Sequence, residues 1–407
     1  MPRMNKVELE FKRIQTYLFA SPRLRAMLGA NASLGKTIRI ELLHRAKKCG
    51  AAPEASVIDQ LPERDDRDPL KPADSLKHRE LLDNPRDIYR NYGVLVRDGG
   101  HFIATFEQNE SAQQFVAQAI ALITEKLPGI LVQARINGQT LQTQDKQTIY
   151  PGEALFQHPS FQVSQHVGNE PAAHRDHRKG FVSTNESAIE ESGRTFRQNP
   201  TDLIGSMEQQ GLIPRRLDEP PQSLGDLSEN GYIALIHADG NSIGKRYQKW
   251  RERCTASDLE KEAHGEHFFH SMRVAVRAAL QKALQEIFAQ TPKSYQLLML
   301  GGDDLLMVCD ASHALPFVRA YAQALKNFEL ADKEPLAIGA GVVIAKKTFP
   351  FHRLHAMAEE LASSAKQLAR ADETLGSVVD WHITSNAWVN DPIAQRRLDS
   401  LNDSAVL

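Results

Sequence analysis

The segment Leu297-Leu-Met-Leu-Gly-Gly-Asp-Asp-Leu-Leu-Met-Val308 holds two glycines and two adjacent aspartates between two apolar runs. This pattern predicts a β-hairpin, because a tight turn needs the backbone freedom of glycine. Most hairpin turns are polar and chemically inert. Here the two acids adjoin strongly apolar strands, and partly buried like charges are unfavourable unless a cation neutralises them. The segment therefore predicts a cation site that includes Asp303 and Asp304.

A third carboxylate follows another apolar run. Residues 232–238 read Tyr-Ile-Ala-Leu-Ile-His-Ala, which predicts a buried strand, and Asp239 comes next. If this strand pairs with the hairpin, the three aspartates meet at one edge of a sheet. Three carboxylates and the backbone carbonyl of Gly240 suit hard divalent cations. We therefore expect two Mg²⁺ or Mn²⁺ ions, which in turn hold a nucleoside triphosphate.

These stretches resemble a known family. The hairpin, together with Ala238-Asp-Gly-Asn-Ser-Ile-Gly244, resembles the palm of nucleotidyl cyclases with the GGDEF signature, and is most similar to the large polymerase-cyclase subunit of type III CRISPR complexes. The likeness continues through Ala337-Ile-Gly-Ala-Gly341, similar to the next palm strand, and through residues 358–370, similar to the phosphate-facing helix. The resemblance implies that Asp239, Asp303 and Asp304 are catalytic. The nucleotide-binding residues that we expect are Asn241, Ser242, Gly244, Lys245, Gly301, Gly302, Lys366 and Arg370.

The second half of the chain repeats the pattern of the first half. The shared order is strand, helix, strand, turn, strand, helix, strand, which is ferredoxin-like. We therefore predict an α+β fold with two palm-like domains in tandem, a pseudo-dimer within one chain. In the first half the elements are expected at 7–19, 30–49, 92–106, 112–127 and 130–136, and in the second at 232–238, 266–290, 297–308, 312–328 and 336–344.

The first copy differs from the second at its turn. Residues 11–32 resemble the opening of the family's first palm, but the turn Asp98-Gly-Gly-His101 carries a single acid. We therefore expect a degenerate site without a metal pair in this domain.

The predicted domains are residues 1–150 for the first palm, 151–229 for a linker, 230–385 for the second palm and 386–407 for a tail. The linker resembles the family's zinc finger with both cysteines replaced, by Ser164 and Val167, so no zinc is expected. Residues 51–85, rich in proline and charge, are expected to form a solvated loop. On the last strand, Trp381 is expected in the core.

The composition favours an ordinary intracellular protein. The 49 basic and 51 acidic residues give a formal net charge of −2, so any contact with RNA must come from local patches. The three cysteines are scattered, which argues for a reducing compartment. No apolar stretch approaches the roughly 20 residues of a membrane span, and no signal peptide is evident. We expect a soluble, cytoplasmic protein without membrane contact, whose oligomeric state and protein or RNA activator the sequence leaves open.

The function that the resemblance implies is that of a nucleotidyltransferase. It would join nucleoside triphosphates, by resemblance ATP, into cyclic oligonucleotide messengers used in antiviral defence. The 407 residues have no room for the family's His-Asp nuclease or for its C-terminal helical domain. We therefore expect a compact variant.

Two alternatives stay open. A dinucleotide cyclase of the diguanylate kind shares the GGDEF signature, but that class usually pairs two identical sites by dimerisation. A non-catalytic subunit that binds nucleotide as a scaffold of an RNA-guided complex needs no intact acids. Product analysis distinguishes the three functions.

Overall fold

The computed structural model describes residues 4–19, 21, 24–73, 76, 78–141, 172–176, 180–195, 203–214, 221, 223–228, 230–255, 257–384 and 393. The chain divides into two compact units, each assembled from three segments. The first unit comprises Met1–Arg64, Pro72–Ser206 and Asp258–Glu266, and the second comprises Asp65–Lys71, Met207–Ser257 and His267–Leu407.

The first unit is built on a five-stranded sheet with the order β2-β3-β1-β4-β5. Its central strand β1 pairs antiparallel with β3 and with β4. Alternate residues of β1, among them Val7 and Leu9, are fully buried, as expected for a strand with one face on the core. The strands are β1 (Asn5–Lys12), β2 (Val94–Val96), β3 (His101–Phe106), β4 (Leu131–Ile136) and β5 (Gln139–Thr140).

Helix α6 (Asn109–Lys126) packs on β1, β3 and β4 of this sheet. Its apolar residues recur every three or four positions, so Phe115, Ala119 and Ile123 all face the core. The other elements of the unit are α1 (Ile14–Leu18), α2 (Leu24–Lys36), η1 (Thr37–Glu41), α3 (Leu42–Lys48), α4 (Ala55–Ile58), η2 (Arg79–Leu81), α5 (Pro85–Tyr92), β6 (His174–Asp176), β7 (Gly180–Val182) and α7 (Thr184–Thr195).

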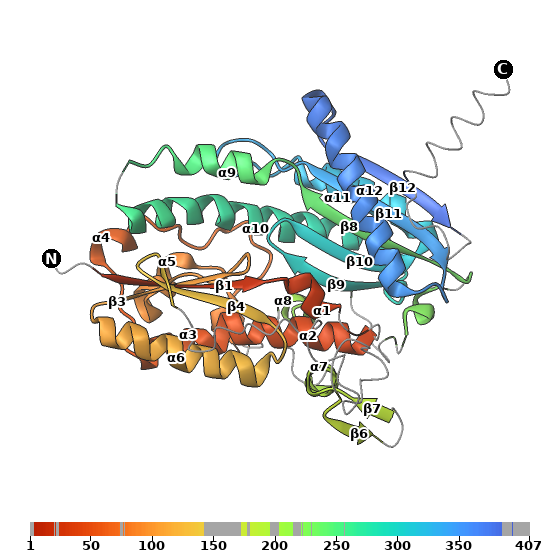
Figure 1. Ribbon diagram of the computed structural model, residues 1–407. Coiled ribbons are helices and arrows are strands. Elements are labelled where there is room, and N and C mark those ends of the chain that lie inside the picture. Colours follow the sequence, from red (N-terminus) through yellow and green to blue (C-terminus); the bar gives the residue numbers. More distant parts are fainter. Residues whose placement is uncertain are drawn as a thin grey trace. The chain divides into compact units, whose positions relative to one another are not determined.

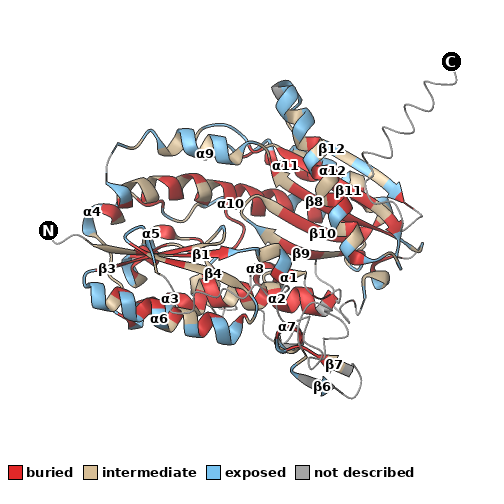
Figure 2. Cartoon of the chain, in the orientation of Figure 1, coloured by how far each residue is buried: buried red, intermediate tan, exposed pale blue. Residues whose placement is uncertain are grey.

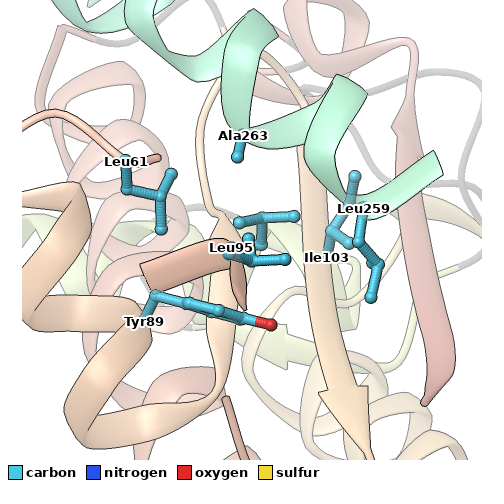
Figure 3. Packing of buried hydrophobic residues seen from close by; sticks show 7 residues of the cluster. Leu61, Tyr89, Leu95, Ile103, Leu259 and Ala263 are labelled. Carbon is cyan, nitrogen blue, oxygen red and sulfur yellow. The ribbon is translucent and has the colours of Figure 1, made fainter. Parts of the chain in front are cut away.

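The start of helix α10 (Asp258–Phe288) belongs to the core of the first unit. Figure 3 shows its Leu259 and Ala263 beside Leu95 and Ile103 of the sheet. A segment from the second half of the chain thus completes a hydrophobic cluster of the first.

The second unit has a five-stranded sheet with the order β12-β11-β8-β10-β9 (Figure 1). Strand β8 lies between β10 and β11 and is antiparallel to both, while β11 and β12 are parallel. Strands β8 and β10 are almost entirely buried (Figure 2). The strands are β8 (Tyr232–Gly240), β9 (Tyr295–Gly301), β10 (Asp304–Asp310), β11 (Ile338–Lys346) and β12 (Val378–Thr384).

Helix α12 (Phe351–Ala371) packs on β11 and β12 (Figure 1). Its apolar residues Leu354, Met357, Leu361 and Ala365 form one buried stripe. The other elements that lie in the second unit, or enter it, are α8 (Leu203–Gln209), η3 (Leu224–Leu227), α9 (Ile243–Arg251), α10, η4 (Ala311–His313), α11 (Ala314–Leu325) and η5 (Glu373–Leu375).

The two sheets share one topology, which confirms the predicted α+β fold with two palm-like domains. Four successive strands of each unit lie in the order second, third, first, fourth, namely β2-β3-β1-β4 and β9-β10-β8-β11. This is the ferredoxin-like arrangement that the repeated sequence pattern predicts. Each sheet gains one further edge strand, antiparallel in the first unit and parallel in the second.

Three local predictions are wrong. The first strand ends at Lys12 rather than at residue 19, because Arg13 takes a left-handed conformation and helix α1 follows. Residues 51–85 are not a solvated loop, since they contain α4 and bury Leu61 and Leu70. Trp381 is 46% exposed, because β12 is an edge strand.

Some predictions fall outside the described residues. These are the domain boundaries at 150, 229 and 385 and the cysteine replacements Ser164 and Val167, so they stay predictions. Within the described part, no helix is long and apolar enough to cross a bilayer.

Candidate functional site

The predicted hairpin is present, and its turn carries the two acids. Strand β9 ends at Gly301, which pairs with Asp304 at the start of β10. Gly302 has φ +60°, a left-handed value that suits glycine at the first position of a two-residue turn. Asp303 therefore occupies the second turn position, and Asp304 begins the returning strand.

Strand β8 brings the third acid to the same place. Leu305 of β10 pairs with Ala238, so Asp239 lies beside the start of β10. The next residue, Gly240, packs against the turn, because a Cβ atom at this position would lie 2.7 Å from Oδ2 of Asp303. The sequence prediction that the three aspartates converge is thus matched by the backbone pairing.

The carboxyl group of Asp239 contacts those of Asp303 and Asp304. Asp303 and Asp304 both hydrogen-bond to Asp239. Because a carboxylate only accepts hydrogen bonds, each of these contacts needs a proton on one partner. Burial and the charges of Asp239 and Asp304 raise the pKa of Asp303 to about 8. Asp303 is therefore largely protonated at neutral pH in this arrangement.

Asp304 and Asp239 respond to their surroundings in opposite directions. Burial raises the pKa of Asp304, although the neighbouring His237 opposes the shift. Burial would also raise the pKa of Asp239, but the ammonium of Lys366 in contact with its carboxylate outweighs burial and lowers it. The pKa of Asp239 therefore lies below its usual range, and this carboxylate is ionised at neutral pH.

Lys366 reaches this site from helix α12. Its side chain crosses β11 at Gly339, where a Cβ atom would lie 2.5 Å from Cγ of Lys366. Gly339 is the partner of Asp239 in the β8–β11 ladder, so the glycine leaves room for the lysine stem directly beside the acid. The sequence predicts a phosphate-binding role for Lys366, and the structure places its ammonium on Oδ2 of Asp239.

Two histidines, the buried His237 and the partly buried His355, lie near the acids. His237 faces the same side of β8 as Asp239, as strand alternation predicts, and its Nε2 lies 3.9 Å from Oδ1 of Asp304. The ring of His355 from α12 stacks on that of His237 with a centroid separation of 6.1 Å. Burial and the neighbouring His237 lower the pKa of His355 to about 4, so His355 is neutral at physiological pH.

The loop after Asp239 is more ordered than the sequence suggests. Asn241 donates from Nδ2 to the carbonyl of Gly376 at 3.1 Å, and its buried Oδ1 has no hydrogen-bond partner among the described residues. Ser242 has φ +58° and precedes α9. Gly244 and Lys245 therefore lie in the first turn of a helix, where Lys245 is exposed, rather than in the turn that the sequence indicates.

The remaining predicted residues are less closely engaged. Gly301 faces open space, with no atom within 4 Å of a Cβ placed there. Arg370, one helical turn after Lys366, is exposed, and no contact with the carboxylates is found among the described residues. The nucleotide-binding roles of both residues stay predictions.

The donor set fits a hard divalent cation. Three carboxylates are oxygen donors of this kind, and burial together with the charge of Asp239 raises the pKa values of Asp303 and Asp304. Within the described ranges, no group of three or more histidine, cysteine, aspartate or glutamate side chains is arranged to hold a metal ion. The cation that contacts Asp239 here is Lys366, so metal binding stays a prediction.

The turn of the first unit is arranged differently. Its single acid, Asp98, forms an ion pair with Arg39. Arg39 belongs to η1, a π-helical turn within a longer helical segment. The carboxylate of Asp98 is therefore neutralised by the protein itself, in keeping with the predicted degenerate site.

Sequence reasoning missed Gly339 and His355. Gly339 carried a signal, because a glycine inside a strand often marks close approach of another group. His355 carried none, since one histidine on an amphipathic helix does not reveal its neighbours.

Residues 232–374 match the family model for Cas10/Cmr2, second palm domain. The chain is similar to the solved Csm1-Csm4 cassette in complex with cA4, with 12% identity and a TM-score of 0.48 over 90% of this chain and 53% of that chain. It is also similar to the cassette in complex with one ATP, with 12% identity, a TM-score of 0.48 and coverage of 90% and 54%.

A third similar structure is Csm1 in T. onnurineus, with 12% identity, a TM-score of 0.48 and coverage of 91% of this chain and 52% of that chain. The chain thus spans about half the length of these structures. A search of curated proteins finds no match.

Proposed function

We propose, on the premise that the chain carries the second palm domain of the Cas10/Cmr2 family at residues 232–374, that it is a nucleotidyltransferase. It joins nucleoside triphosphates, with ATP as substrate, into cyclic oligonucleotides that act in defence against foreign nucleic acid. The observation that carries the proposal is the contact of Asp239 with Asp303 and Asp304 in this palm.

In this reaction a ribose hydroxyl of one nucleotide attacks the α-phosphorus of another. A new oxygen–phosphorus bond forms, the bond from the α-phosphorus to its bridging oxygen breaks, and pyrophosphate leaves. Mg²⁺ or Mn²⁺, held by the three aspartates and the carbonyl of Gly240, would lower the pKa of the attacking hydroxyl and neutralise phosphate charge.

The residues of the chain supply position and charge. The hairpin fixes Asp303 and Asp304, and β8 fixes Asp239 beside them, so the acids are preorganised by backbone hydrogen bonds. Preorganised charge of this kind is commonly the largest contribution to catalysis. Lys366 and Lys245 are the basic side chains that we assign to the triphosphate, and Asn241 and Ser242, which follow strand β8, are the polar residues that we assign to the nucleotide.

The test is incubation of the purified chain with each nucleoside triphosphate and Mn²⁺, followed by chromatography of the products and an assay for pyrophosphate. We expect cyclic products and pyrophosphate from ATP. A dinucleotide formed from GTP alone would instead identify a diguanylate-type cyclase. Nucleotide binding without pyrophosphate at any metal concentration would identify a non-catalytic binding subunit.

The variant that tests the assignment of the site is Asp303→Ala. We expect at least about a 100-fold loss of pyrophosphate release, because this substitution removes one of the three carboxyl groups that would hold the cations. Circular dichroism should show an unchanged fold, since Asp303 lies in a turn. Normal turnover by this variant would show that the site is assigned wrongly.

A further inference from the structure

The contact between Lys366 and Asp239 is built into the packing of the second unit. The stem of Lys366 lies over Gly339, and a Cβ atom there would also lie 3.1 Å from the backbone nitrogen of Lys366. Any larger residue at position 339 would displace the lysine. The ammonium is thereby directed at Oδ2 of Asp239.

Asp239 is the acid that contacts both of the others. It accepts hydrogen bonds from Asp303 and Asp304, so the three acids and Lys366 form one connected group. The side chains of Lys366 and Asp239 are 17% and 30% exposed, so solvent and ligands reach the pair. A partly exposed ion pair is weak enough to exchange partners.

Formal charges show what such an exchange would do. Once a divalent cation displaces the proton of Asp303, three ionised aspartates carry −3, and Lys366 reduces this to −2, which that cation neutralises. A second divalent cation would leave the group at +2, which is unfavourable in a partly buried site. The negative charge of a triphosphate offsets this positive charge. Less positive charge remains at the acids if Lys366 moves from Asp239 to the phosphates.

We propose that Lys366 is an exchangeable cation, which holds Asp239 in the nucleotide-free protein and moves to the triphosphate when nucleotide binds. Divalent cations and nucleotide then bind cooperatively. A cation at Asp239 releases Lys366 for the phosphates, and a nucleotide that binds Lys366 frees Asp239 for a cation. The inference rests on the proposed function, since it assumes that a triphosphate binds at this site.

Arg246, a second basic residue of the same unit, binds its acidic partner through more contacts than Lys366 does. Arg246 holds Asp332 through Nε and Nη2 at 2.8 and 2.7 Å, and it also donates to the carbonyls of Glu334 and Pro335. Such a fork is fixed in direction. Lys366 instead contacts Asp239 with a single ammonium on a flexible four-carbon stem, which suits transfer between two anions.

The experiment measures Mn²⁺ binding to the full chain by electron paramagnetic resonance. The nucleotide probe is an ATP analogue with a methylene bridge between the α- and β-phosphates, which prevents transfer. For the unsubstituted chain we expect the analogue to increase Mn²⁺ affinity by about 10-fold or more, and Mn²⁺ to increase analogue affinity by the same factor. Equal Mn²⁺ affinity with and without the analogue would overturn the proposal.

The decisive variant is Lys366→Met, which keeps the stem and removes the charge. Without nucleotide, we expect this variant to bind Mn²⁺ about 10-fold more tightly than the unsubstituted chain, because no ammonium competes for Asp239. The enhancement by the analogue should be smaller than in the unsubstituted chain, because only the part that depends on Lys366 is lost. Lys366→Arg, which keeps the charge, should bind Mn²⁺ without nucleotide as weakly as the unsubstituted chain.

Lys249→Met is the matched control, because Lys249 is exposed on α9 and was not assigned to the site. It should leave both affinities unchanged. Unaltered Mn²⁺ binding by Lys366→Met would overturn the exchange even if product still forms. Conversely, cooperative binding without pyrophosphate release would support the exchange and contradict the proposed enzyme activity.

Discussion

Asp303 is the residue whose ionisation is most altered by the fold. Its pKa is raised to about 8 by burial and by the two neighbouring aspartates. The ordinary value of 3.8 applies once the chain unfolds. Between these two pH values the folded state keeps a proton that the unfolded state has lost, so stability falls as pH rises.

The metal-free chain should therefore lose stability as pH rises from about 5 to about 8, and the slope should flatten above about 8. Asp303→Asn removes the titrating group and should weaken this dependence. Urea unfolding at a series of pH values, with chelator present, measures both slopes. If the substituted and unsubstituted chains show the same slope, the environment described for Asp303 is wrong.

The sequence predicts the identity of the acidic residues better than their partners. Asp239, Asp303 and Asp304 each follow or interrupt an apolar run, so their position at strand ends is visible in the sequence. The partner of Lys366 is not visible, because it depends on Gly339 lying under α12. The register between a helix and the strand that it covers is set by packing, which a single sequence does not specify.

At the scale of elements, alternation and helical spacing predict both sheets but not all of their ends. Alternation predicts one strand over residues 7–19, which include Ile14, Tyr17 and Leu18. The structure uses these residues in helix α1. Trp381 was placed in the core because it is large and apolar, but β12 is an edge strand that exposes alternate side chains. Edge positions follow from topology, which local patterns leave open.

The joint between β11 and α12 depends on Gly341. A Cβ atom at this position would lie 2.1 Å from the carbonyl oxygen of Ala358 and 2.5 Å from the backbone nitrogen of Ala362. Both neighbours are helix backbone and cannot rotate away. Gly341→Ala must therefore shift α12, and with it Lys366.

We expect Gly341→Ala to lower the free energy of unfolding by about 1–3 kcal/mol or more, as for other overpacked sites. Gly244→Ala is the matched control, since it lies in a helix and its added methyl group meets no atom within 4 Å. It should change stability by less than about 1 kcal/mol, in the stabilising direction. Urea unfolding measures both variants, and equal stability of the two would contradict the packing described.

At the scale of the whole molecule, the two units exchange segments along the chain. The first unit includes Asp258–Glu266 from the second half, and the second unit includes Asp65–Lys71 from the first half. The second exchange is not visible in the sequence, because this short segment is mostly polar and its composition predicts a solvated loop. This segment contacts the second unit through Asp68, which pairs with Arg277, 209 residues away in the sequence.

Asp68 and Arg277 form a buried ion pair that anchors this segment in the second unit. Nε and Nη2 of Arg277 donate to the two carboxylate oxygens at 3.1 and 2.6 Å, and the side chains are 2% and 1% exposed. Removing one residue would take this buried counterion from the other. Such losses commonly reach about 3–5 kcal/mol, whereas replacing both partners costs much less.

Asp68→Ala should therefore destabilise the full chain by about 3–5 kcal/mol, and Arg277→Met by a similar amount. The double variant should lose less stability than the sum of the two single losses, because it contains neither charge of the pair. The control is Arg67→Met in the same segment, whose exposed ion pair with Asp65 should contribute less than about 1 kcal/mol. Urea unfolding of these four variants and of the unsubstituted chain provides the test. Additive losses in the double variant would show that the two residues stabilise the second unit independently, and that the anchor lies elsewhere in the segment.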